Sequence, residues 1–276
     1  NEGAVNETTY VFDKKTAAFR SICQNGEKIL SGGQFQFFRA PTGIDEGTHE
    51  PGRNYADEWS RAGLAATAMH GHDAGRAQDT NPTDATIPGA DGAQDANPSD
   101  TGRAYDIETL SVHKGERHVM IEARLTWRQP QIHAQITWTI GSNGMRWNGF
   151  VLNECAADTL PRIGFAFCTP ESTNGLCWYG RGPQETYADR KSTAFMGLYH
   201  STVSEQHVPY IVPCECGGHE DCVYLQLGCG NAFTKAHTTE NGNPSPGDGT
   251  LTFTAAKPFH FSALPYSTAA YAKAGY

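Results

Sequence analysis

The sequence contains no apolar run that approaches the length of about 18 residues that a membrane-spanning helix needs. It also shows no basic segment followed by an apolar one near Asn1, which is the pattern of a secretory signal peptide. We therefore expect neither a membrane partner nor a leader. The start lacks a methionine, and Tyr276 ends the chain within a helical pattern, so we expect a piece of a longer polypeptide.

Positive charge is scarce as well. The 21 Lys and Arg residues face 30 Asp and Glu residues, which gives a formal net charge of −9. A nucleic acid or an anionic membrane surface would call for a basic face, so the composition argues against both as partners. A neutral polar partner fits the charge balance better.

The eight cysteines lack the two tight C-x-x-C pairs that structural zinc sites usually show. Their irregular spacing in a chain of 276 residues indicates free thiols that fill sheet interiors, and hence a cytoplasmic protein. The alternative is a zinc site at Cys214, Cys216 and Cys222, with His207 and His219 nearby.

What the chain does have is turns and alternating strands. The 30 glycines and 15 prolines separate short segments in which apolar and polar residues alternate, the pattern of half-buried strands. One short helix is expected at 54–62. Strands are expected at 8–12, 17–22, 27–30, 34–39, 119–128, 131–140, 145–152, 161–168, 194–199, 221–227, 250–255 and 259–263. Hairpin connections throughout predict an all-β sandwich that forms a single domain over 1–276.

Residues 69–103 form an acidic insertion of low complexity, nearly free of large apolar side chains. A doublet, QDTNPTD at 78–84 and QDANPSD at 94–100, places Asp and Asn oxygens at alternate positions. Such oxygens suit Ca²⁺, so one interpretation is a calcium-binding loop within 78–100. The other is a solvated insertion between two strands that has no core of its own.

The densest polar chemistry lies at residues 178–190, which read WYGRGPQETYADR. Arginine and carboxylate groups in such a segment either lock loops together or bind the hydroxyls of a sugar, on which aromatic rings stack. We expect partners for this segment from two other Pro- and Gly-rich segments, across a shared rim of loops. The candidate residues are Tyr179, Arg181, Glu185, Asp189 and Arg190, with Arg39, Asp45, Tyr210 and Glu215 as the partners across the rim.

Three segments resemble signatures of one family. FRAPTGID at 38–45, WYGRGPQETYADR at 178–190 and PYIVPCECG at 209–217 are similar to the C-terminal, small-chain domain (domain 5) of family 2 β-galactosidases. Phe38 stands where that family usually has Trp, and Gly43 and Ile44 stand where it has Asp and Asn. The resemblance implies the antiparallel supersandwich of two large sheets that the galactose mutarotases share.

In that family the domain packs beside a TIM barrel that supplies the two glutamates of a retaining hydrolysis. Repeated strand and helix units are missing from this chain, so we expect it to be inactive alone. The resemblance implies that it supports the site where terminal β-galactosides are hydrolysed, without a cofactor, with the remaining domains as partners and in a homo-oligomer. The alternatives are an aldose 1-epimerase, with His207 and Glu215 as acid and base, and a carbohydrate-binding module.

Overall fold

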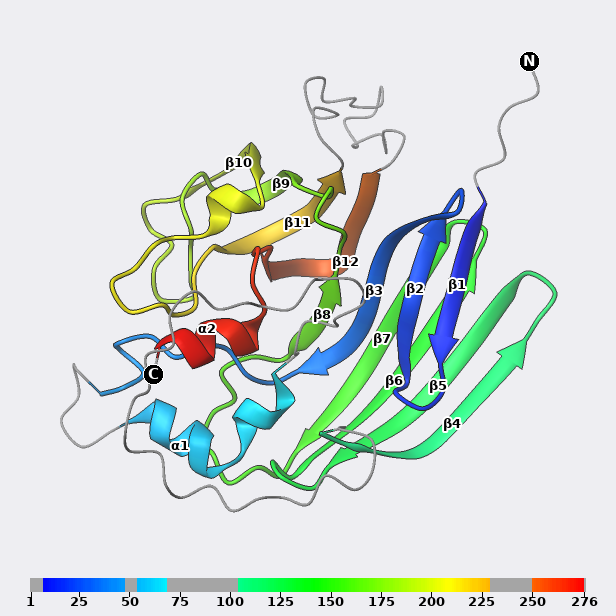
Figure 1. Ribbon diagram of the computed structural model, residues 1–276, viewed down its shortest axis with the longest axis horizontal. Coiled ribbons are helices and arrows are strands. Elements are labelled where there is room, and N and C mark those ends of the chain that lie inside the picture. The colour runs from blue at the N-terminus through cyan, green and yellow to red at the C-terminus, as the bar shows by residue number, and fades with distance from the viewer. Residues whose placement is uncertain (1–6, 48–53, 69–103, 229–249, 276) are drawn as a thin grey trace, which may run out of the picture.

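The computed structural model describes residues 7–47, 54–68, 104–228 and 250–275, and all that follows concerns those ranges. They form twelve strands and two short α-helices, and every pairing between neighbouring strands is antiparallel (Figure 1). The predicted all-β fold class is confirmed. No helix in the described ranges has the length and apolar character of a membrane span. The insertion 69–103, with its suggested calcium loop, lies outside the described residues.

One sheet contains the long strands that the alternation predicted. Its order is β4 (Asp106–Lys114), β5 (His118–Trp127), β6 (Ile132–Gly141) and β7 (Gly144–Asn153). Trp127 and Trp138, from neighbouring strands, are each 1% exposed and point to the same side. The alternate residues on the other side are mostly polar and open to solvent, so this sheet buries one face only.

A second sheet packs against that buried face. Its order is β1 (Thr8–Asp13), β2 (Ala18–Gln24), β3 (Glu27–Gln36) and β8 (Gly164–Cys168). The prediction of separate strands at 27–30 and 34–39 was wrong, because β3 runs without a break through the first range and into the second, where it ends at Gln36. Gly32 and Gly33 have φ values of 98° and 80°, and the register against β8 shifts between Gly32 and Gln34. A glycine bulge thus joins the two alternating stretches.

The third sheet has the order β10 (Phe195–Thr202), β9 (Gly175–Gly182), β11 (Gly218–Gly228) and β12 (Thr250–Ser262). Here too, two predicted strands, 250–255 and 259–263, form one. The pairing of β12 with β11 passes from Thr254 opposite Tyr224 to Phe259 opposite Cys222, which leaves extra residues at an irregularity. Two stretches of alternation in one strand therefore looked like separate strands.

The main core lies between the first two sheets, where aromatic rings from both meet. Phe19 of β2 lies edge-on to Trp138, with ring centroids 6.0 Å apart, and Phe35 of β3 lies edge-on to Trp127 at 6.1 Å. The third sheet has a smaller cluster of its own. Its buried members are Leu176, Trp178, Cys222, Leu225, Leu227 and Phe261.

The two α-helices lie beside the sheets in Figure 1, near the ends of β3 and β8. The predicted helix at 54–62 is confirmed as α1 (Tyr55–Arg61), whose N-cap Asn54 accepts a hydrogen bond from the Asp57 amide at 2.9 Å. The second helix, α2 (Thr268–Gly275), buries Tyr271. Short 3₁₀ turns occur at Leu64–Thr67 and Ser204–Gln206.

The described strands thus form three four-stranded sheets, where the resemblance implied two large ones. β8 is one of the two edge strands of the second sheet, and β12 is one of the two edge strands of the third.

Candidate functional site at the loop rim

Three loops meet at one end of the third sheet, and we call residues 39–47, 183–194 and 207–217 the loop rim. Backbone and side-chain hydrogen bonds join them directly. The Glu215 amide donates to the Ala40 carbonyl at 3.3 Å, and the Gly217 amide donates to the Glu185 carboxylate at 2.9 Å. The three sequence segments singled out above therefore do come together in space.

Glu185 is the centre of the loop rim. Its carboxylate accepts hydrogen bonds from Tyr187 Oη at 2.8 Å, from the Gly217 amide, from Tyr210 Oη, and from Arg190 Nη2 at 2.9 Å. The side chain is only 7% exposed. Burial by itself raises the pKa of Glu185, but the donors and the Arg190 charge outweigh it and hold that pKa below its usual range. The group is a fixed carboxylate that ties two loops together.

Arg39 and Asp45 behave differently from the expectation that they reach across the rim. Two parallel hydrogen bonds of 2.7 and 2.9 Å join the guanidinium to the carboxylate, and Thr42 adds its amide and its hydroxyl. The Arg39 guanidinium also lies 5.0 Å over the Trp59 ring. These contacts close the first loop on itself and seat it on α1.

Glu215 has a partner that the sequence did not reveal. It forms an ion pair with Arg162, which precedes β8, and its side chain is 4% exposed. Arg162 is 53 positions away in a segment that carries no other polar signature. A buried pair of this kind is costly to break, because the remaining charge stays desolvated.

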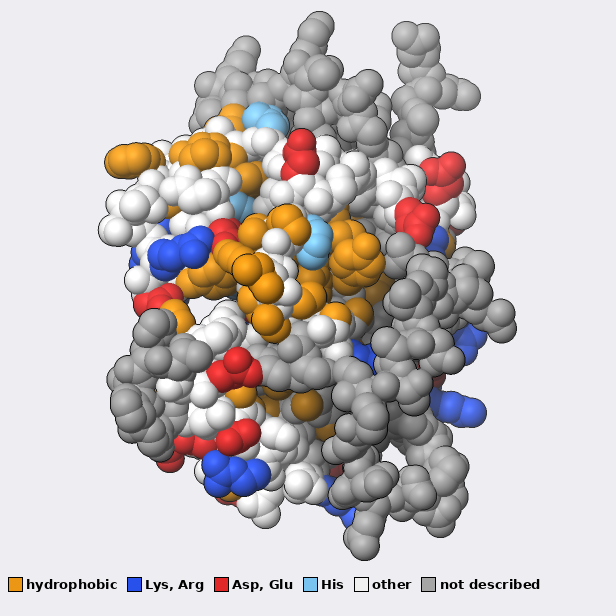
Figure 2. Space-filling model, turned by 60° about the vertical axis from the view of Figure 1, so that its left-hand side comes forward, with side chains coloured by type: hydrophobic (Ala, Val, Ile, Leu, Met, Phe, Trp, Pro, Cys, Tyr) orange, Lys and Arg blue, Asp and Glu red, His pale blue; other side chains and the backbone are white. Residues whose placement is uncertain are grey.

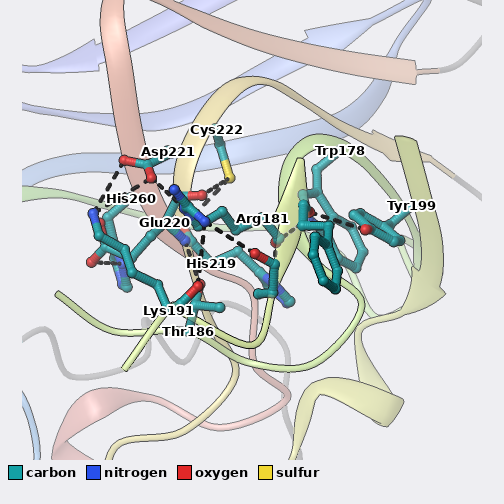
Figure 3. A network of polar contacts seen from close by, with 12 residues as sticks. Trp178, Arg181, Thr186, Lys191, Tyr199, His219, Glu220, Asp221, Cys222 and His260 are labelled. Carbon is teal, nitrogen blue, oxygen red and sulfur yellow. Dashed lines mark hydrogen bonds and ion pairs between the residues drawn. The ribbon is translucent and has the colours of Figure 1, made fainter. Parts of the chain in front are cut away.

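Arg181 bonds across the third sheet to β11, and Figure 3 shows the network. Its Nε donates to Asp221 Oδ2 at 2.5 Å, and Nη1 donates to the carbonyls of Ala194 at 3.0 Å and Lys191 at 3.3 Å. Asp221 sits in a bulge with φ 55°, a left-handed conformation that is unusual for a residue other than glycine. The hydrogen bond from Arg181 is the main cause that lowers the pKa of Asp221.

His219, beside that bulge, is a residue that sequence reasoning interpreted only as a neighbour of cysteines. It is 1% exposed, its ring lies 4.2 Å from that of Trp178, and Nε2 is 2.7 Å from Gln206 Oε1. Trp178 Nε1 donates to the Arg181 carbonyl, which also faces His219 Nδ1 at 3.3 Å. Burial lowers the pKa of His219 to about 4, so the ring is neutral at pH 7.

A second histidine, which contacts a carboxylate, also belongs to this network. His260 Nδ1 of β12 lies 3.0 Å from Glu220 Oε1, and the Glu220 amide donates to Thr186 Oγ1 at 2.8 Å (Figure 3). The hydrogen bond with His260 is the main cause that lowers the pKa of Glu220. Neither residue was a candidate from the sequence, since only the β11–β12 register brings them together.

The remaining candidates occupy separate places. Tyr179 is 41% exposed and its ring stacks with that of Tyr224 on β11, with centroids 6.4 Å apart. Because strand residues alternate, Tyr179 lies on the opposite face of β9 from the buried Trp178. Asp189 is exposed on the loop rim. His207 Nδ1 lies 2.7 Å from Tyr271 Oη, while Glu215 pairs with Arg162, so the proposed acid and base of an epimerase have different partners.

The cysteines suggested for zinc are spread over different parts of the fold. Cys222 belongs to the cluster under the third sheet, whereas Cys216 packs with Ala40 and Tyr271. Burial raises the pKa of Cys222 to about 12 and that of Cys214 to about 11, which disfavours the thiolate that zinc requires. Among the described residues, no group of three His, Cys, Asp or Glu side chains is placed to hold a metal ion.

A large open groove adjoins the loop rim and runs between β8 and β12, with α2 along one side. Its volume is about 2270 Å³. Several large apolar side chains that line it are open to solvent: Ile44, Ile163, Tyr210, Ile211, Val212 and Tyr266. Figure 2 shows hydrophobic side chains gathered at the middle of one face, next to a hollow. An exposed apolar surface of this kind marks an interaction site.

Comparison with known proteins gives a consistent family assignment. A family described as the β-galactosidase small chain matches residues 4–276. Among curated proteins, a β-galactosidase of Vibrio cholerae is 28% identical over 222 residues, which is 79% of this chain and 19% of that enzyme. One from Psychromonas ingrahamii is 26% identical over 78% of this chain and 18% of the enzyme.

A β-galactosidase of Priestia megaterium is 31% identical over 42% of this chain and 11% of the enzyme. The chain therefore spans at most about a fifth of the length of these relatives. Because the match to the family covers nearly every residue, the chain belongs to the β-galactosidase small chain family.

Proposed function

We propose that this chain is the C-terminal, non-catalytic part of a β-galactosidase, which docks on the rest of the enzyme and shapes the site where terminal β-galactosides are hydrolysed. The observation that carries the proposal is the contrast between the acidic and the apolar side chains of the loop rim. The carboxylates of Asp45, Glu185 and Glu215 are engaged in internal contacts, whereas the large apolar side chains of the loop rim face solvent.

Retaining glycoside hydrolysis needs two carboxyl groups about 5–5.5 Å apart, with room for a sugar between them. Glu185 holds four hydrogen-bond donors and Glu215 is buried against Arg162, so neither is open to a glycosidic bond. The proposal therefore assigns the nucleophile and the acid/base to the remaining polypeptide, in the barrel that the family resemblance implies.

The apolar part of the loop rim supplies the docking energy. Ile211 is fully exposed, and Ile44 and Val212 are 56% and 51% exposed. Burial of a side chain of this size is worth roughly 1.5–3 kcal/mol when it is complete. Three such side chains held on loops that are already fixed lose little conformational entropy on binding, which favours a stable interface.

The polar part of the loop rim is where we place contact with the sugar. Asp189 and Arg190 lie beside the groove, Asp189 is exposed, and the Arg190 side chain is 58% exposed although it also pairs with Glu185. Charged groups of this kind hydrogen-bond to sugar hydroxyls. In this proposal they orient a galactoside whose scissile bond lies on the partner domain.

Hydrolysis of a nitrophenyl β-galactoside tests the proposal. We expect no turnover above buffer from this chain alone, and turnover from the complete β-galactosidase that contains it. In the complete enzyme, Ile211→Asp should weaken the association of this part with the remaining domains at least ~10-fold, equivalent to about 1.4 kcal/mol. Phe195→Asp, at a side chain that is 73% exposed on β10 and outside the groove, is the matched control.

The contrary result is equally clear. Turnover by the chain alone that Glu185→Gln abolishes, in a variant that keeps its fold, would overturn the non-catalytic assignment. Equal effects of Ile211→Asp and Phe195→Asp on this association would remove the loop rim as the docking surface.

A further inference from the structure

Two strand edges that pair with no other described strand line the groove. β8 is bonded to β3 on one side, and no described strand pairs with its other side. β12 is bonded to β11 and is likewise the last strand of its sheet among the described residues. The residues of β8 and much of β12 line the groove, and the two strands lie close together in Figure 1.

The edge of β8 lacks the charged side chains and prolines by which many proteins protect an exposed strand. Its sequence is GFAFC, without a charged residue or a proline. The edge strand β4, by contrast, carries Asp106, Glu108 and Lys114. Charged residues and prolines discourage an edge from pairing with another strand, so no side chain of β8 opposes pairing with an added segment.

The burial of β8 supports the same conclusion. All five of its residues are half-buried, although the strand lies at the edge of a sheet. On the side away from β3, its backbone groups face the groove in partly apolar surroundings, where an unpaired amide or carbonyl is costly. Hydrogen bonds from a neighbouring strand would satisfy these amides and carbonyls.

Aromatic side chains connect the two edges and form a common floor. The Phe167 ring of β8 lies 5.8 Å from that of Phe253 on β12, and Trp147 of β7 lies 5.4 Å from Phe167 and 6.4 Å from Phe253. All three residues are only partly buried. The floor therefore has apolar area left to cover, and a strand with alternate apolar side chains would cover it.

We propose that the groove takes up an extended segment of the β-galactosidase polypeptide outside this chain, which pairs with the free edge of β8 and packs its apolar side chains on this aromatic floor. The added strand extends the second sheet toward β12 and brings the sandwich nearer to the two large sheets that the family resemblance implied. The inference rests on the proposed function, since the segment proposed to occupy the groove belongs to the rest of that enzyme.

The choice of occupant follows from the size of the relatives. This chain matches 11–19% of the two β-galactosidases from Vibrio cholerae and Priestia megaterium, so most of the polypeptide of those enzymes has no counterpart here. A second copy of this chain is the competing occupant. It would have to offer an edge strand of its own, and it would bind in a concentration-dependent way.

Amide hydrogen exchange of residues 161–171 tests the proposal, with the isolated chain compared with the complete enzyme. In the isolated chain we expect the outward-facing amides of β8 to exchange quickly. In the complete enzyme they should exchange at least ~10-fold more slowly, since a tenfold protection corresponds to about 1.4 kcal/mol. Protection of residues 207–217 is followed in the same experiment as the signal of docking at the loop rim.

Two matched variants sharpen the test. Ile163→Asp places a charge beside β8 in the groove, at a side chain that is 62% exposed, whereas Phe150→Asp alters one that is 66% exposed on β7 and outside the groove. Both should leave the thermal midpoint of the isolated chain unchanged. In the complete enzyme, only Ile163→Asp should restore fast exchange in β8.

The outcomes separate the two proposals. Protection of 207–217 with no change in β8 would overturn the added strand and leave the proposed function standing. Protection of neither segment in a complete, active enzyme would overturn both. Protection of β8 in the isolated chain that rises with its concentration would show a second copy in the groove and overturn the assignment of the occupant.

Discussion

Glu185 concentrates much of the loop rim's polar energy in one side chain. Its replacement by alanine would leave the Gly217 amide and the hydroxyls of Tyr187 and Tyr210 without their acceptor. Each unsatisfied buried group costs about 1–3 kcal/mol, so we expect Glu185→Ala to lower the free energy of unfolding by roughly 2–4 kcal/mol. Urea denaturation of the isolated chain measures the change.

Asp189→Ala is the control from the same loop, because Asp189 is exposed. It should leave stability within about 0.5 kcal/mol of the unaltered chain. If both variants unfold at the same urea concentration as the parent, Glu185 does not hold the loops together. A loss of sugar affinity confined to Asp189→Ala would support its proposed contact with substrate.

At this scale the sequence indicated which loops come together better than it indicated which side chains pair. The Glu185–Arg190 pair spans five positions of one loop, and a pattern of acid and arginine suggests it. Glu215 with Arg162 spans 53 positions, and Arg181 with Asp221 spans 40. Such pairs depend on strand register, which a local pattern does not encode.

Among the elements, β11 has the feature most open to experiment. Its second residue, His219, is a buried neutral histidine. The folded state holds the pKa of His219 at about 4, against 6.5 for the free group. Between these values the unfolded chain binds a proton that the folded chain does not, so stability falls as the pH drops below 6.5. The full difference is on the order of 3 kcal/mol.

Urea denaturation at pH values from 7 to 4.5 should show this dependence, with a slope of up to about 1.4 kcal/mol per pH unit from His219. His219→Gln should flatten the slope. His118→Gln, at an exposed position of β5, should not. Glu185, Glu220 and Asp221 have lowered pKa values and lose their contribution only at more acidic pH, so they fall outside this window. If His219→Gln and His118→Gln show the same dependence of stability on pH, the slope does not come from His219.

Element boundaries show where alternation is informative and where it is not. The long strands β5 and β6 were predicted to within a few residues, because each alternates without interruption. β3 and β12 were each divided in two, because a glycine bulge in one and an irregular pairing in the other reset the alternation. Alternation reports which side chains share a face, and it loses continuity wherever an extra residue is inserted.

For the molecule as a whole, the unequal cores predict unequal stability. Among the described residues, twenty buried ones belong to the core centred between the first two sheets, whereas six form the cluster under the third. Local opening costs less where fewer apolar contacts are lost. In the isolated chain, the amides of β9 and β11 should therefore exchange faster than those of β5 and β6, as mass spectrometry of proteolytic peptides would show. Equal protection in all four strands would mean that the chain opens only as one unit.

The all-β class followed from composition and alternation, yet the division into three sheets did not. Sheet membership is decided by which edges pair, and β3 with β8 joins residues more than a hundred positions apart. The groove is likewise invisible in sequence, because its lining comes from the loop rim and from β3, β7, β8, β11, β12 and α2. Ile163 and Ile211 look like ordinary strand or loop residues until the fold places both beside the same groove.

The position of Trp147 gives the chain an optical reporter of its own. Four of the five tryptophans are buried, at 1–3% exposure, whereas Trp147 is partly open and lines the groove. When the groove is filled, the fluorescence emission of Trp147 should move to shorter wavelength and be quenched less by iodide. The filling of the groove could thus be followed in real time by intrinsic fluorescence, without a label.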